Sequence, residues 1–427
     1  MASSRAPDAA PAPRPFTALA VTLAVQALAS FALTAPSVLA PVVASDLGLP
    51  ARNVGWLVSI AYLAAMMSGL YGGWLSQRHG PVRLSQWALY AGAAAFALFA
   101  AGRPLWLLAA AFVVGVGYGL PNPSAAEILS RHAPANRRGL FFSVKQTGVP
   151  LGVALAGATI PWLTSLSGWR TAALALALPM AAIGMALGAS RRGLDGAVRA
   201  APAAREKPAL ADMVRQRLVA PVRDVLAFEP TRRLALTSLV YALTQVCFLT
   251  FLVSLLTLEH GHPLAVSAGL LSASQAVAVV CRVGWGHVSD RWVDPTRLLG
   301  VLGIAMAAGV ALLGLAPRPA PWPWLIASAL TCAATAVAWN GVYFADLARH
   351  VPAARIAQIT GGTQVMTFFG GMSGAAVFAG AVGVAGSYGA VFAALAIAPA
   401  LTGLVLLRAA GRGRGIAPAA GGRAGSP

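Results

Sequence analysis

Hydrophobic residues along this chain gather in long blocks, and short polar segments separate one block from the next. Each block is continuously apolar for about twenty residues, which is the length that an α-helix needs to cross a bilayer. A transmembrane β-strand would instead alternate between apolar and polar residues over about ten positions, so the blocks predict helices. Twelve such blocks are present, at about 16–40, 54–75, 84–101, 105–129, 140–163, 169–189, 234–257, 265–287, 297–315, 322–346, 357–381 and 388–407.

The composition also indicates a membrane protein. Hydrophobic residues make up 58% of the chain and charged residues 10%, with a mean hydropathy of +0.72. A soluble domain carries roughly 25% charged residues. We expect residues 1–15 and 409–427 to be disordered tails. The first apolar block is too long for a signal-peptide core, so we expect it to remain as the first helix.

The net charge of +19 follows the order of the blocks. We number the loops between consecutive blocks from the N-terminus. The two tails and the even-numbered loops hold 25 of the 31 Lys and Arg residues, whereas the odd-numbered loops hold Arg52, Arg103, Arg170 and Arg318. This asymmetry is the positive-inside pattern, which places both termini in the cytoplasm and argues against nucleic acid as a partner. The abundance of Ala, Gly and Arg suggests a bacterial source. Together with the twelve apolar blocks, this predicts a multi-pass protein of the inner membrane.

One short basic phrase occurs twice. "RHAPANRR" begins at Arg131 and "RHVPAARI" begins at Arg349, 218 positions later. At the same offset Asn122 matches Asn340, and further matches extend this agreement around both phrases. Since an even number of helices separates the two copies, they are parallel repeats, an arrangement found in transporters that rock two bundles about a central site.

The repeat predicts an all-α integral membrane protein of twelve transmembrane helices, arranged as two parallel six-helix bundles. The expected N-terminal bundle covers 16–190, the cytoplasmic linker 191–233 and the C-terminal bundle 234–408. A short amphipathic helix is expected in the linker, near 209–228.

The segments after the second helix of each half resemble the signature of the major facilitator superfamily, G-x-x-x-D-R-x-G-R. The first copy, "GWLSQRHGPVR", has a glutamine at the acidic position, and the second, "GHVSDRWVDPTR", has an aspartate. We expect these residues to form a gating latch, in which a glycine allows close approach of helices and an aspartate caps a helix start and holds an arginine. They are Gly73, Gln77 and Arg78 in the first copy and Gly286, Asp290 and Arg291 in the second.

The resemblance implies that helices 1, 4, 7 and 10 line a central cavity, with helices 5 and 8, and 2 and 11, at the seam between the bundles. Polar residues in these helices can serve as substrate ligands or as ordinary hydrogen-bond partners between helices. Candidates are Gln26, Tyr118, Asn122, Tyr241, Gln245, Gln275, Trp339, Asn340 and Tyr343, with Gln146 beside them in the fifth helix.

Two cations, Lys145 and Arg282, fall inside predicted helices. A lone cation near the centre of a helix costs about 2.5–3.5 kcal/mol on insertion scales, so it normally faces a cavity or a partner. No acid lies between the helix ends, which predicts a positive cavity and an anionic substrate. The stretch "CRVGWGHVSDR" also resembles the eighth helix of the monocarboxylate and oxalate–formate branch, where an arginine at the place of Arg282 contacts the substrate carboxylate.

These features together predict a secondary transporter that moves a small organic anion by alternating access, as a monomer and without a cofactor. A drug or cation exporter would carry an embedded acid, and a membrane sensor would carry a sizeable soluble domain. An enzyme would cluster its histidines and acids, which are spread out here. Cys247, Cys281 and Cys332 lie in apolar blocks without CxxC spacing, so no metal site is expected. The sequence does not identify the coupling ion, and the proton is the candidate.

Overall fold

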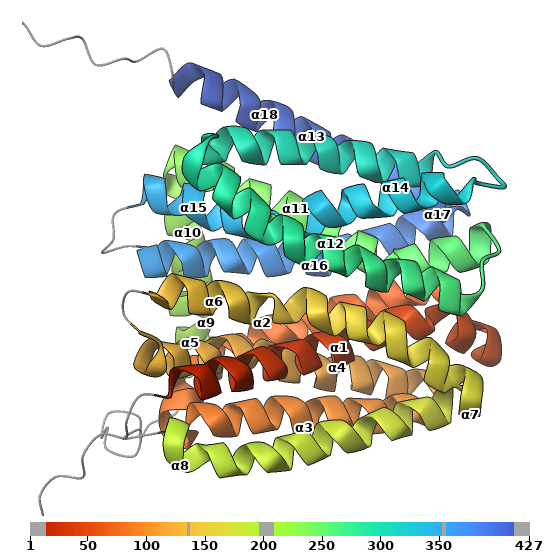
Figure 1. Cartoon of the computed structure of the whole chain (residues 1–427), viewed down its shortest axis with the longest axis horizontal. Helices are drawn as coiled ribbons and strands as arrows, with labels where there is room; N and C mark the ends of the chain where they lie inside the picture. Colours follow the sequence, from red (N-terminus) through yellow and green to blue (C-terminus); the bar gives the residue numbers. More distant parts are fainter. Residues whose placement is uncertain (1–13, 135–136, 196–208, 352–355, 414–427) are drawn as a thin grey trace, which may run out of the picture.

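The computed structural model describes residues 14–134, 137–195, 209–351 and 356–413. Its described residues form helices and connecting turns, without a β-strand. Figure 1 shows the helices of the first half of the sequence gathered in one group and those of the second half in another, with their axes running in a common direction. The expected tails and the centre of the linker fall largely outside the described residues.

The first half begins with α1 and ends with a short helix, α8. Several helices start at proline, whose fixed φ suits the first helical position and whose missing N–H is not needed there. The elements are α1 Pro15–Leu47, α2 Val54–His79, α3 Pro81–Ala100, α4 Pro104–Gly119, α5 Pro121–His132, α6 Arg138–Gln146, α7 Gly148–Ala186 and α8 Arg191–Leu194.

Two interruptions in the first half have clear sequence causes. The helices α4 and α5 are one membrane span broken at Pro121, where proline removes a backbone donor. In α7, Gly168 adopts a φ of +75°, which separates the fifth and sixth spans although the helix is otherwise continuous. Glycine suits this position because a Cβ disfavours positive φ.

The second half repeats this pattern after one linker helix. This linker helix comprises α9 Leu210–Val214, the π-helical η6 Arg215–Val219 and α10 Ala220–Ala227, so the short linker helix expected at 209–228 is present. The spans are α11 Glu229–Ser254 with the π-helical η7 Leu255–Glu259, α12 Leu264–Arg291, α13 Pro295–Gly314, α14 Trp322–Cys332 with the π-helical η8 Ala333–Val337, α15 Asn340–His350, α16 Ile356–Ala385, α17 Tyr388–Leu395 and α18 Ile397–Gly413. Since α18 continues to Gly413, the first residues of the expected C-terminal tail are helical.

Ten of the described helices are long and apolar enough to cross a membrane. One of these, Leu140–Leu194, holds two spans on either side of Gly168. The other difference from twelve is α3, whose first turns carry Arg83, Ser85 and Gln86 and are therefore more polar. The twelve predicted blocks are thus all helical in this all-α fold, with the fifth and sixth blocks sharing α7.

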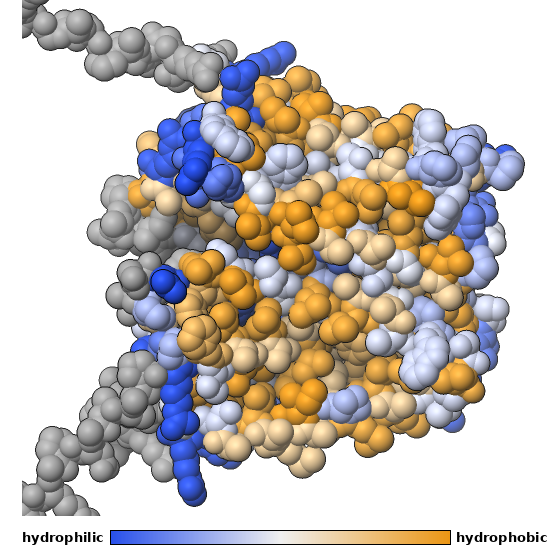
Figure 2. Space-filling model, in the orientation of Figure 1, coloured by the Kyte–Doolittle hydropathy of each residue, from blue (hydrophilic) through white to orange (hydrophobic). Residues whose placement is uncertain are grey.

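The outer surface matches a bilayer. Figure 2 shows hydrophobic residues over the middle of the molecule and hydrophilic residues towards its two ends. Large apolar side chains such as Leu155, Leu178 and Val280 are exposed around this middle region. Such a broad exposed apolar surface is what lipid contact requires.

The two halves contact each other mainly at one end of the molecule. We call the end that carries Pro15 and Gly413 the terminus-side end, and the opposite end the far end (Figure 1). In the far half of the seam, Ser59 Oγ donates to Met372 O at 2.6 Å, which joins α2 to α16. Ser272 Oγ donates to Ala154 O at 2.7 Å, which joins α12 to α7.

Glycines allow the backbones to approach each other closely in this far half. A Cβ on Gly157 would lie 2.5 Å from Ala268 O, and a Cβ on Gly55 would lie 2.4 Å from Ala375 O. In the terminus-side half of α12, Gly286 has no neighbouring atom within 4 Å of a hypothetical Cβ. The halves are therefore closed against each other at the far end and separated towards the terminus-side end.

The linker helix packs over the terminus-side end of the seam. The α10 helix packs against α11 and α16, where a Cβ on Gly362 would lie 2.4 Å from Pro221 O. From η6, Arg217 reaches across to α2 and donates to Leu70 O at 2.9 Å. The linker therefore contacts helices of both halves.

Candidate functional site

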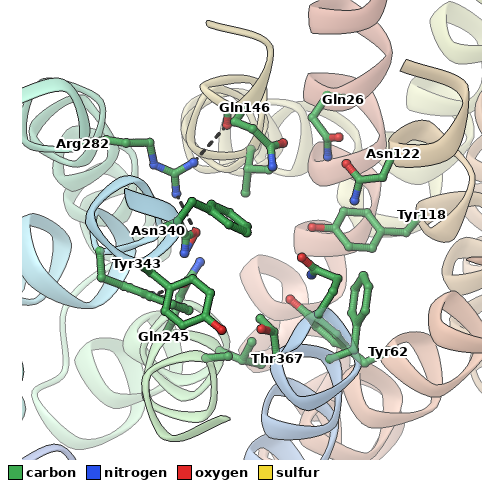
Figure 3. Close-up of a pocket in the computed structure, with 17 residues that line it drawn as sticks. Gln26, Tyr62, Tyr118, Asn122, Gln146, Gln245, Arg282, Asn340, Tyr343 and Thr367 are labelled. Carbon is green, nitrogen blue, oxygen red and sulfur yellow. Dashed lines mark hydrogen bonds between the residues drawn. The ribbon is translucent and has the colours of Figure 1, made fainter. Parts of the chain in front are cut away.

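A cavity of about 100 Å³ lies between the two halves, midway along the seam. Figure 3 shows side chains from the first half facing side chains from the second half across it. Nine of the twelve polar and charged residues that the sequence singles out line this cavity, and Lys145 lies directly behind it, bonded to Gln26 and Asn122. The nine are Gln26, Tyr118, Asn122, Gln146, Gln245, Arg282, Trp339, Asn340 and Tyr343.

Arg282 bonds to three acceptors at the cavity. Its guanidinium donates to Val337 O at 2.7 Å in the second half. It also donates to Asn340 Oδ1 at 3.3 Å in the second half and to Gln146 O at 3.1 Å in the first half (Figure 3). The Nε atom is buried without a hydrogen-bond partner among the described residues. Arg282 thus links α12 to the tenth span within the second half and also links the two halves. Its Nε–H remains as a donor without a partner in the described part of the chain.

The carbonyls that Arg282 binds lack normal partners within their helices. Pro150 lies four residues after Gln146 and has no N–H, so the Gln146 carbonyl receives no helical hydrogen bond from it. Val337 ends η8, and the helix resumes only at Asn340, so its carbonyl belongs to an interrupted turn. Trp285, one turn after Arg282, donates in the same way to Ala334 O at 2.7 Å.

Lys145 occupies a cage of amide oxygens in the first half. Its side chain is 2% exposed. Nζ donates to Gln26 Oε1 at 2.7 Å, to Asn122 Oδ1 at 2.6 Å and to Gln146 Oε1 at 3.3 Å. Three acceptors match the three donors of an ammonium group. Gln146 contacts both cations, with its side chain on Lys145 and its carbonyl on Arg282.

No carboxylate of the described residues forms a salt bridge with Lys145 or Arg282. Eight of the described acids instead pair at the ends of the helices or in the linker. The pairs are Asp46–Arg170, Glu127–Arg131, Asp195–Arg191, Asp212–Arg215, Glu229–Arg233, Glu259–Arg318, Asp294–Arg349 and Asp346–His350. The two basic side chains at the cavity, Arg282 and Lys145, therefore lack a fixed counter-charge from the described residues, and the cavity attracts anions.

Aromatic and amide side chains complete the cavity wall. Tyr62 packs edge-on against Tyr118, with ring centroids 6.1 Å apart, and also contacts Phe368. On the opposite wall Trp339 packs against Tyr343 and donates from Nε1 to Gln245 Oε1 at 3.1 Å. The wall thus offers flat apolar faces alongside hydrogen-bonding groups.

Sequence reasoning missed several lining residues in the second and eleventh spans. These are Tyr62 on α2 and Gln364, Thr367 and Phe368 on α16. Gln364 could have been found, because it matches Gln146 at the repeat offset of 218. Two other candidates do not line the cavity: Tyr241 donates to Leu299 O at 2.7 Å and Gln275 donates to Ser274 Oγ, so both act within the helix packing.

The signature residues lie at the terminus-side end, and their charged groups are not joined in this conformation. Gln77, Arg78, Asp290 and Arg291 are exposed. Arg78 stacks on the Trp74 ring, and Gly73 makes room for Arg217 of the linker.

A different aspartate caps the helix start that follows the second signature. Asp294 accepts from Arg297 N at 3.2 Å and pairs with Arg349 at 2.6 Å. These hydrogen bonds hold the pKa of its carboxyl below the usual range, although partial burial acts in the opposite direction. The capping role expected of Asp290 is therefore filled by Asp294, and a latch through Asp290 remains a prediction for a conformation closed at this end.

Comparison with known proteins identifies one protein family, and the similar proteins are transporters. A family model described as Major Facilitator Superfamily matches residues 22–375. The chain is similar to the arabinose-proton symporter of Escherichia coli (strain K12), at 33% identity over 33% of this chain and 30% of that protein. It is also similar to the niacin transporter NiaP of Acinetobacter baylyi, at 32% identity over 31% of each chain, and to the probable sulfoacetate transporter SauU of Cupriavidus necator, at 30% identity over 33% of each chain. The match therefore spans about a third of the length of these relatives.

Solved structures share the fold over nearly the whole chain. A peptide transporter POT in complex with sulfate superposes with a TM-score of 0.71 at 18% identity, covering 94% of this chain and 96% of that one. A D-xylose-proton symporter gives a TM-score of 0.69 at 16% identity, covering 92% and 97%. At these identities the likeness establishes the fold.

Proposed function

This chain belongs to the major facilitator superfamily, and on that premise we propose that it is a secondary transporter that moves a small organic anion across the membrane by alternating access. The observation that carries this proposal is the convergence of Arg282 and Lys145 on one central cavity without a carboxylate from the described residues. Arginine offers paired, directional donors that match a carboxylate, and its charge is permanent at all physiological pH values.

The cavity chemistry favours an anion over a cation or a neutral solute. The desolvated charge of Arg282 would repel a cationic drug, and it strengthens the binding of an anion because the surrounding wall is of low dielectric. The unpartnered Nε of Arg282 supplies a donor for a carboxylate oxygen. Two of the similar proteins are named as a niacin transporter and a probable sulfoacetate transporter, and both named substrates are carboxylates. Another is named as an arabinose-proton symporter, so a neutral sugar is the alternative substrate to be tested.

The proposed moving bodies are the two bundles expected from the repeat, residues 16–190 and 234–408, joined by the linker 191–233. Contacts at the far end and separation at the terminus-side end correspond to one of the two alternating conformations. With both termini in the cytoplasm of a bacterial inner membrane, this conformation faces inward. The proposed carrier acts as a monomer, with the lipid bilayer and its anionic substrate as partners.

Transport by purified protein in proteoliposomes tests this proposal. We expect uptake of at least one radiolabelled carboxylate from a panel of acetate, lactate, nicotinate, oxalate and sulfoacetate, measured with and without a pH gradient. Arabinose and a lipophilic cation serve as the alternative substrates. Uptake of the sugar or the cation, with no carboxylate moved, would overturn the proposal.

A further inference from the structure

Lys145 is held in a way that suits two protonation states. Lys145 is the one lysine within the described part of the chain, and all three of its side-chain partners are neutral amides from α1, α5 and its own helix. A carboxylate partner would fix the ammonium form by ion pairing. Amide partners exert no such bias, because they carry no net charge.

An amide group can serve either form of the lysine. The ammonium has three N–H donors, and three amide oxygens accept them here. A neutral amine has two donors and one lone pair, so one amide must present its NH₂ group instead. Rotation of the Gln26 or Asn122 amide by half a turn does this, because amides carry a donor and an acceptor of nearly equal size.

The surroundings of Gln26 can follow such a rotation. Its Nε2 now donates to Ser30 Oγ at 3.4 Å. A hydroxyl both donates and accepts, so Ser30 can donate to Oε1 once the amide has turned. The cage therefore satisfies the neutral and the charged lysine without an orphaned polar group, which would otherwise cost about 1–3 kcal/mol.

We propose that Lys145 is the proton-carrying group of this carrier, loaded when an anion enters the cavity and unloaded when the anion leaves. This inference rests on the proposed anion transport. It assigns the fixed charge to Arg282 and the exchangeable charge to Lys145. The two roles differ because guanidinium stays protonated in proteins whereas a buried ammonium loses its proton readily.

Electrostatics couples the proton to the anion. In the empty cavity a charged Lys145 has neutral amides as its side-chain partners, and no opposite charge among the described residues offsets its burial. An anion bound at Arg282 supplies an opposite charge and favours the ammonium, and by reciprocity the ammonium raises the affinity for the anion. The other titratable groups facing the cavity are Tyr62, Tyr118 and Tyr343, while the described acids are exposed or engaged elsewhere.

The step balances in charge and atoms. A proton from water joins the lone pair of Lys145 Nζ, and one monoanion binds at Arg282. Both cross when the halves rock, and both are released to the other side, so a net-neutral pair moves in each cycle. A pH gradient then drives accumulation of the anion, while the membrane potential has little effect on the loaded carrier.

Calorimetric titration of the purified carrier tests this assignment. The probe is the monocarboxylate that binds most tightly among acetate, lactate, nicotinate and benzoate, measured from about pH 6 to about pH 9 in phosphate and in Tris. The difference in heat between the buffers counts the protons bound. We expect uptake of up to one proton per anion, with affinity falling by as much as tenfold per pH unit in the upper part of the range.

Substitution of the lysine then identifies the site. Lys145→Arg should retain binding but show no proton uptake, with affinity constant to within about twofold across the range. If arginine does not fit the cage, Lys145→Gln must likewise abolish the uptake. The control Arg215→Gln removes an exposed linker charge and should behave as the parent.

The outcomes separate this inference from the proposed function. Anion binding with no proton uptake by the parent protein, or with uptake unchanged in Lys145→Arg and Lys145→Gln, overturns the role of Lys145 and leaves anion transport intact. Failure of the parent to bind any carboxylate overturns the proposed function itself.

Discussion

Replacing Arg282 with lysine separates its role in binding an anion from its role in holding the helices together. The substitution keeps one positive charge but removes the planar fork of donors. In the structure that fork reaches Val337 O and Gln146 O at once, and a single ammonium cannot span both. We therefore expect a loss of stability, of about 1–3 kcal/mol for each buried carbonyl left without a donor.

The effect on substrate is a separate quantity. If the spare donors of Arg282 bind a carboxylate, losing one charge-assisted hydrogen bond of about 1.5–3 kcal/mol raises Kd roughly tenfold to a hundredfold. Thermal shift of the purified protein with and without carboxylate measures both effects. Trp285→Phe is the matched control, because it removes a hydrogen bond to the same interrupted helix, at Ala334 O, without touching the cavity charge.

The pattern across the two variants decides the question. Both should lower the Tm without ligand, but only Arg282→Lys should lose most of the shift that the ligand causes. An undiminished ligand-induced shift in Arg282→Lys would mean that Arg282 is a structural pin and does not bind substrate.

Three further predictions concern topology, gating and the seam. Lys207→Cys, in a background without accessible cysteines, should react only with reagents that reach the cytoplasm; modification from the periplasm of intact cells would refute the topology. Asp290→Asn should slow transport more than Gln77→Ala, because only the second signature has a charged aspartate, and equal transport rates at matched expression would argue against an asymmetric latch. Gly157→Val should block far-end closure, because its side chain meets Ala268 O at a cost of about 1–3 kcal/mol, and transport at the parental rate would contradict this.

The span pattern and the cavity ligands were predictable from sequence because each depends on a local rule. Continuous apolar blocks identify spans, and the cost of burying charge singles out Lys145 and Arg282. The acceptors of Arg282 were not predictable in the same way. Val337 O is available only because the tenth span is interrupted after a π-helical turn, and nothing in the run of Ala, Val and Thr residues marks that interruption.

The contribution of Pro150 lies between these cases. Its missing N–H donor can be read directly from the sequence. That the freed Gln146 carbonyl accepts from the opposite half depends on the approach of α12 to α7, which is a property of tertiary packing. Likewise the second and eleventh spans were expected at the seam, but which of their residues face the cavity, here Tyr62 and Thr367, depends on the packing of the two halves.

The linker helix determines where the gene could be divided. Because α10 packs on α11 and α16, and reaches α2 chiefly through Arg217 and α9, it belongs structurally to the second half although it precedes its first span. Fragments 1–208 and 209–427 would each keep the contacts within their own bundle, and co-expression would have to re-form the seam between the bundles and the contact of α9 and Arg217 with α2. A division after Ala227 would instead leave an apolar helix on the first fragment, without the surface that normally covers it.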